Sequence, residues 1–172
     1  MAQETGPAEY RVEPLGLTHD RAAFSCGVPE LDAYLQRRAG LDQGRKLAGV
    51  FILTKDGNGA AGFYTLSAYT ILAAELPAEL AKRLPRFPVP VTLLGRMAIA
   101  QYLQGQGWGE FLLVHALKRA ALGSRQVPSW AVVVDAKAGA RDFYLHQDFT
   151  PLPGQPERLF LQMKTIEGMF EL

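Results

Sequence analysis

The chain has 172 residues, of which 48% are hydrophobic and 20% are charged, and its formal net charge is +1. This composition suits one folded domain, residues 1–172, and the near-zero charge gives no sign of a nucleic-acid partner, although it is compatible with a local basic face. The single cysteine, Cys26, excludes an internal disulfide, and no apolar stretch reaches the length of a membrane span. The N-terminus lacks the basic and apolar regions of a signal peptide, so we expect a cytoplasmic protein.

The N-terminal part predicts a loose start followed by a strand and a helix. Residues 1–9 carry no clear pattern and are expected to be loosely attached. Weak alternation over residues 10–15 predicts an edge strand. Pro29 suits the first turn of a helix that runs to about Gly40 or Gly44, with Leu31, Tyr34 and Leu35 as its apolar stripe.

Two groups of basic residues stand out. The first basic group consists of Arg37, Arg38, Arg45 and Lys46, and the second basic group consists of Lys82, Arg83 and Arg86. Basic residues on helix faces are more often solvated than functional. They become candidates for nucleic-acid binding only if they converge in space.

The middle of the chain predicts a hairpin, a short helix and a central strand. These elements are expected at residues 49–54 and 60–69 for the hairpin strands, 77–84 for the helix and 93–99 for the central strand. Asp56-Gly57 and Asn58-Gly59 lie between the first two strands, and such pairs accept the positive φ that tight turns need. The prolines after residue 84 favour an extended entry into the central strand.

A loop with three glycines follows the central strand. Gly105, Gly107 and Gly109 are spaced one residue apart, and from Gly109 onward apolar residues recur at helical spacing. The order is therefore strand, glycine loop, helix. Backbone N–H groups in the first turn of a helix are unpaired and lie at the positive end of its dipole, so this order suits an anionic group such as phosphate.

The C-terminal third completes an alternating pattern. We expect a strand over residues 129–135, a short helix over 138–146, and closing strands over 149–152 and 158–163. Strands and helices alternate here, whereas the N-terminal half carries a hairpin. The whole pattern predicts an α/β fold with a mixed central sheet flanked by helices.

The glycine spacing excludes two common phosphate-binding loops. No Gly-Lys-Ser or Gly-Lys-Thr follows, as a Walker loop requires, and the G-x-G-x-x-G spacing of a Rossmann loop is absent. Gln104-Gly105-Gln106-Gly107-Trp108-Gly109 instead matches Q/R-x-x-G-x-G/A. Through this signature the chain resembles the GNAT acetyltransferases. In that family the signature binds pyrophosphate.

Two further stretches extend the resemblance. Residues 136–149, with Ala136, Lys137, Ala140, Phe143 and Tyr144, look like the A-K-x-x-A-x-x-F-Y and G-F elements of the family, except that Asp148 replaces the glycine. Residues 24–35 and 62–67 resemble one subgroup, the acetyltransferase toxins of type II toxin–antitoxin modules. The matches span about residues 24 to 164, and they imply the GNAT fold.

The resemblance also implies a cofactor and site residues. Acetyl-CoA is the implied cofactor, with the pantetheine arm on the backbone of Met97, Ala98 and Ile99 and the pyrophosphate on Gln104, Gly105, Gln106, Gly107, Trp108 and Gly109. Ile99 would also help to polarise the thioester carbonyl. Tyr144, a phenol with an ordinary pKa of about 10, would protonate the leaving thiolate. From periodicity alone, Phe143 and Tyr144 would instead be packing residues.

Other catalytic arrangements are weak. His19, His115 and His146 lie far apart and form no metal-ligand spacing, so we expect no metal. His115 is expected on the helix surface or partly buried. Cys26 has no nearby partner that would make it a nucleophile, and we expect it to be structural.

Three functions remain open. The subgroup resemblance implies a toxin that acetylates the amino group of aminoacyl-tRNA and blocks translation, with a small ribbon-helix-helix antitoxin as partner and a homodimer as assembly. The two alternatives are an acetyltransferase acting on a small amine or a protein N-terminus, and an inactive acyl-CoA-binding regulatory module. The glycine loop and Tyr144 are both present, which argues against the inactive module.

Overall fold

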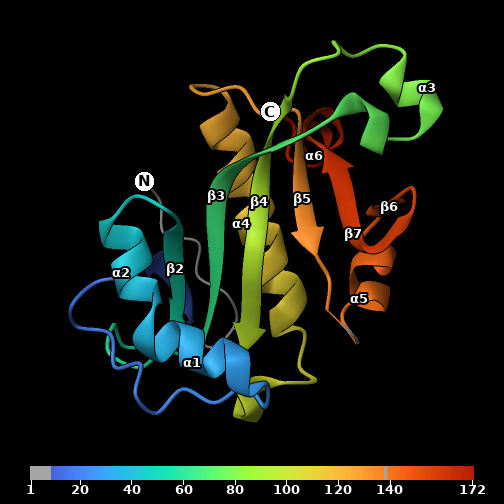
Figure 1. Cartoon of the computed structure of the whole chain (residues 1–172). Coiled ribbons are helices and arrows are strands. Elements are labelled where there is room, and N and C mark those ends of the chain that lie inside the picture. Colours follow the sequence, from blue (N-terminus) through green and yellow to red (C-terminus); the bar gives the residue numbers. More distant parts are fainter. Residues whose placement is uncertain (1–8, 138) are drawn as a thin grey trace. The chain divides into compact units, whose positions relative to one another are not determined.

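The computed structural model describes residues 9–137 and 139–172, and Figure 1 shows its elements. The strands are β1 (Arg11–Pro14), β2 (Gly49–Thr54), β3 (Gly62–Ile71), β4 (Val89–Ile99), β5 (Ala131–Asp135), β6 (Thr150–Leu152) and β7 (Gln155–Gln162). The helices are α1 (Pro29–Arg37), α2 (Ala39–Gly44), α3 (Ala78–Ala81), α4 (Trp108–Ser124), α5 (Arg141–His146) and α6 (Met163–Met169), with 3-10 helices η2 (Ala73–Glu75) and η3 (Gln101–Leu103). This is the mixed α/β architecture that the sequence predicts. Of the predicted loose start, residues 1–9, residues 1–8 lie outside the described residues.

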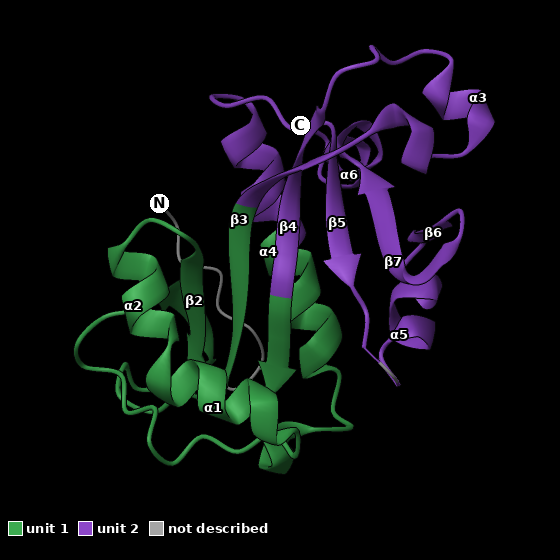
Figure 2. Cartoon of the chain, viewed as in Figure 1, with its two compact units in different colours: residues 1–67, 96–116 green, residues 68–95, 117–172 purple. Residues whose placement is uncertain are grey.

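The chain forms two compact units, coloured separately in Figure 2. Unit 1 comprises residues 1–67 and 96–116, and unit 2 comprises residues 68–95 and 117–172. In unit 1 the strand order is β1-β2-β3-β4, and in unit 2 it is β3-β4-β5-β7-β6. Both β3 and β4 contribute residues to each unit.

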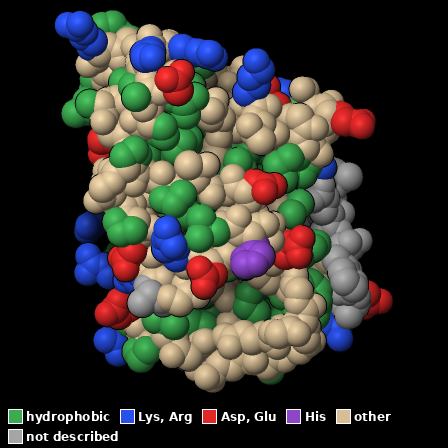
Figure 3. All heavy atoms as spheres, turned by 90° about the vertical axis from the view of Figure 1, so that its right-hand side faces the viewer, with side chains coloured by type: hydrophobic (Ala, Val, Ile, Leu, Met, Phe, Trp, Pro, Cys, Tyr) green, Lys and Arg blue, Asp and Glu red, His purple; other side chains and the backbone are tan. Residues whose placement is uncertain are grey.

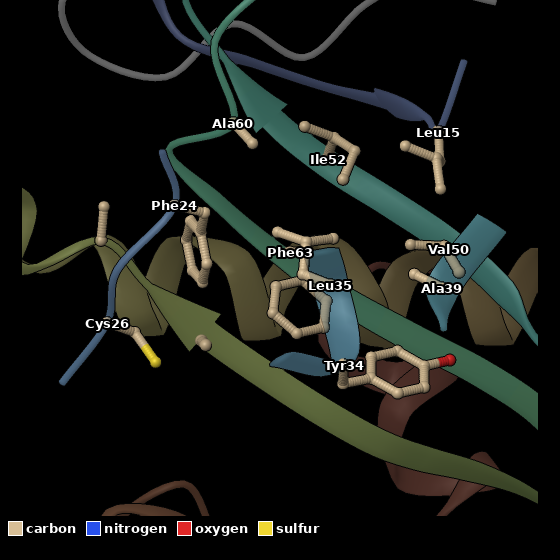
Figure 4. Packing of buried hydrophobic residues seen from close by; sticks show 12 residues of the cluster. Leu15, Phe24, Cys26, Tyr34, Leu35, Ala39, Val50, Ile52, Ala60 and Phe63 are labelled. Atoms are coloured by element: carbon tan, nitrogen blue, oxygen red, sulfur yellow. The ribbon is translucent and has the colours of Figure 1, made fainter. Parts of the chain in front are cut away.

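Unit 1 contains an antiparallel β1–β2–β3 arrangement covered by α1 and α2. The register pairs Ile52 with Phe63 on one face of the sheet and Val12 with Leu53 on the opposite face, and Ile52 and Phe63 belong to the core beneath α1 and α2. In this core Phe63 packs edge-on against Phe24 and stacks with Tyr34, at centroid distances of 5.6 and 6.1 Å (Figure 4). The hairpin between β2 and β3 confirms the turn predicted from the two glycine pairs.

Unit 2 combines parallel and antiparallel pairs. Strand β4 pairs in parallel with β5, and β5 pairs antiparallel with β7. Its core contains Ile71, Val91, Val133, Leu152 and Phe160. The continuous apolar run of β5 is fully buried, as expected for a strand with a parallel neighbour.

The predicted N-terminal helix is wrong in one respect, because it is broken into α1 and α2 at Arg38. Arg38 has φ −117° and ψ −29°, which departs from helical geometry. Leu35 before the break and Ala39 after it are both fully buried, and the hydroxyl of Tyr34 donates a hydrogen bond across the break to Asp42 Oδ2 at 2.9 Å. These contacts hold α1 and α2 against the same core.

Other boundaries also differ from the predicted ones. Strand β4 begins at Val89 rather than at residue 93, since the exposed Pro90 still offers its carbonyl, which accepts the N–H of Trp130 at 2.8 Å. Strand β5 begins at Ala131 and α5 at Arg141, both later than predicted, while β7 begins at Gln155, earlier than predicted. Helix α6, which the sequence pattern did not predict, follows β7.

No helix in the described part of the chain is long and apolar enough to cross a membrane.

Candidate active site: the glycine loop and its surroundings

The candidate cofactor loop lies in unit 1, between the end of β4 and the start of α4. Gly105 and Gly107 have φ values of +76° and +87°, in the left-handed region that favours glycine. A Cβ atom at either position would meet no described atom within 4 Å, so the space beside both residues is open. This is the geometry needed for close approach of a ligand to the backbone.

The loop ends at the N-terminus of a long helix. The carbonyl of Gly107 accepts the N–H of Phe111 at 3.1 Å, which is the first helical hydrogen bond of α4. The preceding N–H groups therefore have no acceptor within the helix, and they lie at the positive end of a 17-residue helix. The loop and the helix start fit a pyrophosphate group.

The structure places Trp108 and Gly109 at the start of the helix. Both lie in the first turn of α4 rather than in the loop, so Gly109 does not require positive φ. Trp108 is buried and packs edge-on against Tyr10 and Phe111, with centroid distances of 4.8 and 5.4 Å. Its side chain anchors the helix start, and only its backbone remains a candidate for contact with phosphate.

The side-chain carboxamides of the two loop glutamines donate hydrogen bonds to backbone carbonyls of the protein. Gln104 Nε2 donates to the carbonyls of Cys26 at 2.7 Å and Ile99 at 2.9 Å, and Gln106 Nε2 donates to the carbonyl of Tyr102 at 3.0 Å. The Cys26 contact joins residues 78 positions apart. Sequence reasoning missed it, since no spacing signal indicates such a contact.

The predicted pantetheine segment, Met97 to Ile99, forms the end of β4 in the same unit. Ala98 and Ile99 are buried, and the backbone continues into η3 through Ala100, whose N–H donates to the carbonyl of Ala61 at 2.9 Å. The structure thus brings residues 97–99 and 104–109 together in unit 1.

Arg96, which the sequence analysis did not assign to the site, is an exposed cation beside this segment. Its guanidinium lies 3.6 Å from the centroid of the buried Tyr34 ring, a cation–π contact. Burial and the hydrogen bond to Asp42 raise the pKa of Tyr34 to about 12. Tyr34 is therefore a neutral platform for Arg96 at physiological pH.

Tyr144, the predicted acid, lies on α5 in unit 2. It is 7% exposed, and its ring packs edge-on against Phe143 and Phe149 at centroid distances of 5.1 and 5.4 Å. Burial raises the pKa of Tyr144 well above its usual range. The phenol is therefore protonated over the whole physiological range, as an acid must be before it donates.

The turn after α5 contains the departure from the family pattern. Asp148 adopts φ +68°, in the left-handed region that glycine takes without strain. Aspartate is among the residues that tolerate this region best. Asp148 can therefore hold a left-handed turn at this position, and Phe149 beyond it is buried against Tyr144.

Both basic groups are exposed, and each lies in a different unit. Arg37, Arg38, Arg45 and Lys46 lie at the ends of α1 and α2 in unit 1, whereas Lys82, Arg83 and Arg86 follow α3 in unit 2. Lys82 Nζ pairs with Glu79 at 3.4 Å on the surface. On the face shown in Figure 3, basic side chains gather at the upper end, at the level at which Figure 1 places α3.

The remaining titratable candidates have structural surroundings. Cys26 is buried, and burial together with its hydrogen bond to Asp32 raises the thiol pKa to about 11. His115 is half-buried and lies 2.8 Å from the hydroxyl of Tyr64. Within residues 9–137 and 139–172, no cluster of three or more His, Cys, Asp or Glu residues could hold a metal ion.

Similarity to individual proteins shows the family of this chain, although no family model matches it. A tRNA-acetylating toxin of Mycobacterium tuberculosis is 36% identical over 151 residues, covering 87% of this chain and 90% of that protein. Probable toxin TacT of Sinorhizobium fredii is 31% identical, covering 96% of this chain and 97% of that protein. The solved complex of AtaT with acetyl-methionyl-tRNAfMet has a TM-score of 0.87 at 31% identity, covering 94% of this chain and 99% of AtaT.

The mixed α/β fold, which this chain shares with AtaT, defines a GNAT-type N-acyltransferase. Identities of 36% and 31% over most of the length of the two toxins narrow this class to one family. The chain belongs to the family of GNAT acetyltransferase toxins.

Proposed function

We propose that this enzyme transfers the acetyl group of acetyl-CoA to the α-amino group of an aminoacyl-tRNA and thereby acts as a toxin that blocks translation. The observation that carries the proposal is the open Gly105–Gly107 loop at the N-terminus of α4, in a chain 36% identical to a tRNA-acetylating toxin. Two solved structures support both substrates, because AtaT is known bound to acetyl-methionyl-tRNAfMet and AtaTR is known bound to AcCoA.

The proposed cofactor residues lie at the end of β4 and in the glycine loop that follows it. In our proposal, the backbone of Met97, Ala98 and Ile99 binds the pantetheine arm. The N–H groups of residues 105–109 bind the pyrophosphate, whereas the N–H of Gln104 donates to the carbonyl of Gln101 at 3.2 Å. Bound acetyl-CoA supplies an activated acetyl thioester, so the protein needs no covalent intermediate if the amine attacks directly.

The transfer then requires no side chain that acts as a strong general base. An α-amine has a pKa near 8, so a sizeable fraction is unprotonated at neutral pH without a strong base. As the new N–C bond forms and the C–S bond breaks, the amine loses a proton to solvent and the leaving sulfur gains one. We assign this second proton to the hydroxyl of Tyr144, and we assign polarisation of the carbonyl to the backbone of Ile99.

The acceptor is a polyanion, and the two basic groups are its proposed binding surface. All seven of their cations are exposed, as contact with phosphates requires. Each such contact would release counterions and contribute to affinity independently of sequence.

The partners and location follow the same reasoning. We propose a cytoplasmic homodimer that is neutralised by a small ribbon-helix-helix antitoxin. Relatives support an antitoxin, since AtaT has been solved with the C-terminus of the antitoxin AtaR. Structures of AtaT–AtaR and KacTA with DNA support a DNA-binding antitoxin. Light scattering of the purified protein would report the dimer.

One experiment separates this proposal from the alternatives. Labelled acetyl-CoA is incubated with the protein and, in parallel, aminoacyl-tRNA, deacylated tRNA, free amino acids and a peptide with a free N-terminus. Label on aminoacyl-tRNA alone supports the proposal, whereas label on free amino acids or the peptide favours the small-amine or protein N-terminus alternative. Cofactor binding without transfer to any acceptor would favour the inactive regulatory module.

A further inference from the structure

Gln104 connects the glycine loop to two other parts of unit 1. Its carboxamide nitrogen donates one hydrogen bond to the carbonyl of Ile99 at 2.9 Å and another to the carbonyl of Cys26 at 2.7 Å. A carboxamide NH₂ has two hydrogens, and these two contacts use both. No donor of this side chain is left for a phosphate.

The segment around Cys26 is joined to the same turn by further contacts. The N–H of Gln101 donates to the carbonyl of Ser25 at 2.9 Å, and the hydroxyl of Ser25 donates to Gln101 Oε1 at 3.3 Å. Gly27 has φ +92°, and a Cβ there would lie 3.1 Å from Gln101 Nε2. Backbone and side chains therefore hold residues 25–27 closely against the turn that precedes the loop.

The same segment is tied to α1. The N–H of Cys26 donates to Asp32 Oδ1 at 2.8 Å, and Gln36 Nε2 donates to the carbonyl of Phe24 at 3.0 Å. A continuous set of hydrogen bonds thus runs from the glycine loop through Gln104 and Cys26 to α1. The far end of α1 carries Arg37, the first residue of the first basic group.

We propose that Gln104 is a positioning residue for cofactor binding, which fixes the glycine loop on Ile99 and Cys26 so that the backbone N–H groups of the loop face the pyrophosphate. The inference rests on the proposed assignment of that loop to acetyl-CoA. Two consequences follow. Gln104 contributes more to recognition of the pyrophosphate, which the loop binds, than to recognition of the pantetheine arm, which it reaches only through the carbonyl of Ile99. Residues 25–28 respond when the cofactor binds.

The first test compares two ligands by calorimetry. Acetyl-CoA carries the pyrophosphate, and S-acetylpantetheine lacks it. Gln104→Met removes the two hydrogen bonds in a side chain of similar length, and we expect the affinity ratio between the two ligands to fall about tenfold, the order expected when two hydrogen bonds are lost. Gln106→Met is the matched control, because it removes one exposed hydrogen bond in the same loop and should lower the ratio less.

General destabilisation would weaken both ligands alike and leave their ratio unchanged, so an unchanged ratio in Gln104→Met overturns the proposal. Gln104→Arg keeps N–H donors at this position and should retain most of the wild-type ratio. These measurements need no acceptor. The proposed role of Gln104 and the proposed acetylation of tRNA are therefore tested separately, and either one can be contradicted without the other.

A second test uses the unaltered protein, which avoids any folding defect. Hydrogen–deuterium exchange is followed with and without acetyl-CoA. We expect the cofactor to slow exchange at residues 104–110 and also at residues 25–28. Slower exchange confined to the glycine loop would show that the Cys26 segment does not respond, which contradicts the proposal.

Discussion

Gly107 combines a positive φ of +87° with the first hydrogen-bond acceptor of α4. Gly107→Val should fold, since a Cβ there meets no described atom within 4 Å. The left-handed conformation costs an L-residue about 1–2 kcal/mol, and the side chain would occupy the space proposed for pyrophosphate. We expect acetyl-CoA to bind at least about tenfold more weakly by calorimetry.

Gly123→Val is the matched control for that substitution. Gly123 lies in α4 without positive φ, and a Cβ there also meets no described atom within 4 Å. The control should bind acetyl-CoA as the parent does. Equal affinity of Gly107→Val and the parent would mean that the glycine loop does not bind the cofactor.

Tyr144→Phe should separate binding from turnover. The variant keeps the ring contacts with Phe143 and Phe149, so the fold and acetyl-CoA affinity should be unchanged. Loss of a positioned acid costs about 100-fold or more, and we expect kcat to fall by that factor. Tyr102→Phe removes a hydroxyl from an exposed tyrosine and should leave kcat unchanged. A normal kcat for Tyr144→Phe would return Tyr144 to a packing role.

The raised pKa of Tyr144 predicts the shape of the pH profile. Its usual value of about 10 is raised by burial, so the phenol stays protonated, and competent as an acid, through pH 10. The acceptor amine must be unprotonated, and its pKa is near 8. For aminoacyl-tRNA, kcat/KM should therefore rise with pH to a plateau above about pH 8, without a descending limb below pH 10. A descending limb centred near pH 8 would argue against Tyr144 as the acid.

At the scale of elements, the two basic groups make a prediction about salt. Phosphate contacts release counterions, so tRNA affinity should fall steeply with added salt, while acetyl-CoA affinity should change less. Reversing Arg37 and Arg38, or Lys82 and Arg83, to glutamate should weaken tRNA binding and flatten this dependence, which filter binding at several salt concentrations measures.

The outcomes for these reversals are distinct. An unchanged salt slope in both double variants would assign the two groups to solvated helix ends. Loss of antitoxin binding with normal tRNA acetylation would assign the altered group to the protein partner instead.

Periodicity predicted most elements, and the misses have physical causes. The run from Pro29 was predicted as one helix because its polar and apolar residues continue at helical spacing. The helix instead breaks at Arg38, whose φ of −117° no spacing of polar and apolar residues indicates. Helix α6 was missed because it has only seven residues, with buried Met163 and Ile166 as its core contacts.

For the candidate site, the glycine signature predicted the loop and the helix that follows it. It could not predict that the Gln104 side chain reaches Cys26, 78 residues earlier in the chain, or that Arg96 stacks on Tyr34. Both contacts join segments whose proximity is created only by the fold. The conformation of Asp148 likewise became clear only from its φ of +68°.

For the whole molecule, the central claim is acetylation of the aminoacyl group on tRNA. The most direct measurement is mass spectrometry of total charged tRNA after incubation with the protein and acetyl-CoA, followed by nuclease release of the terminal aminoacyl-adenosine. We expect one or more aminoacyl-adenosines to gain the mass of an acetyl group, and to gain far less with Tyr144→Phe. Charged tRNA that remains unacetylated while the protein binds acetyl-CoA would contradict the account.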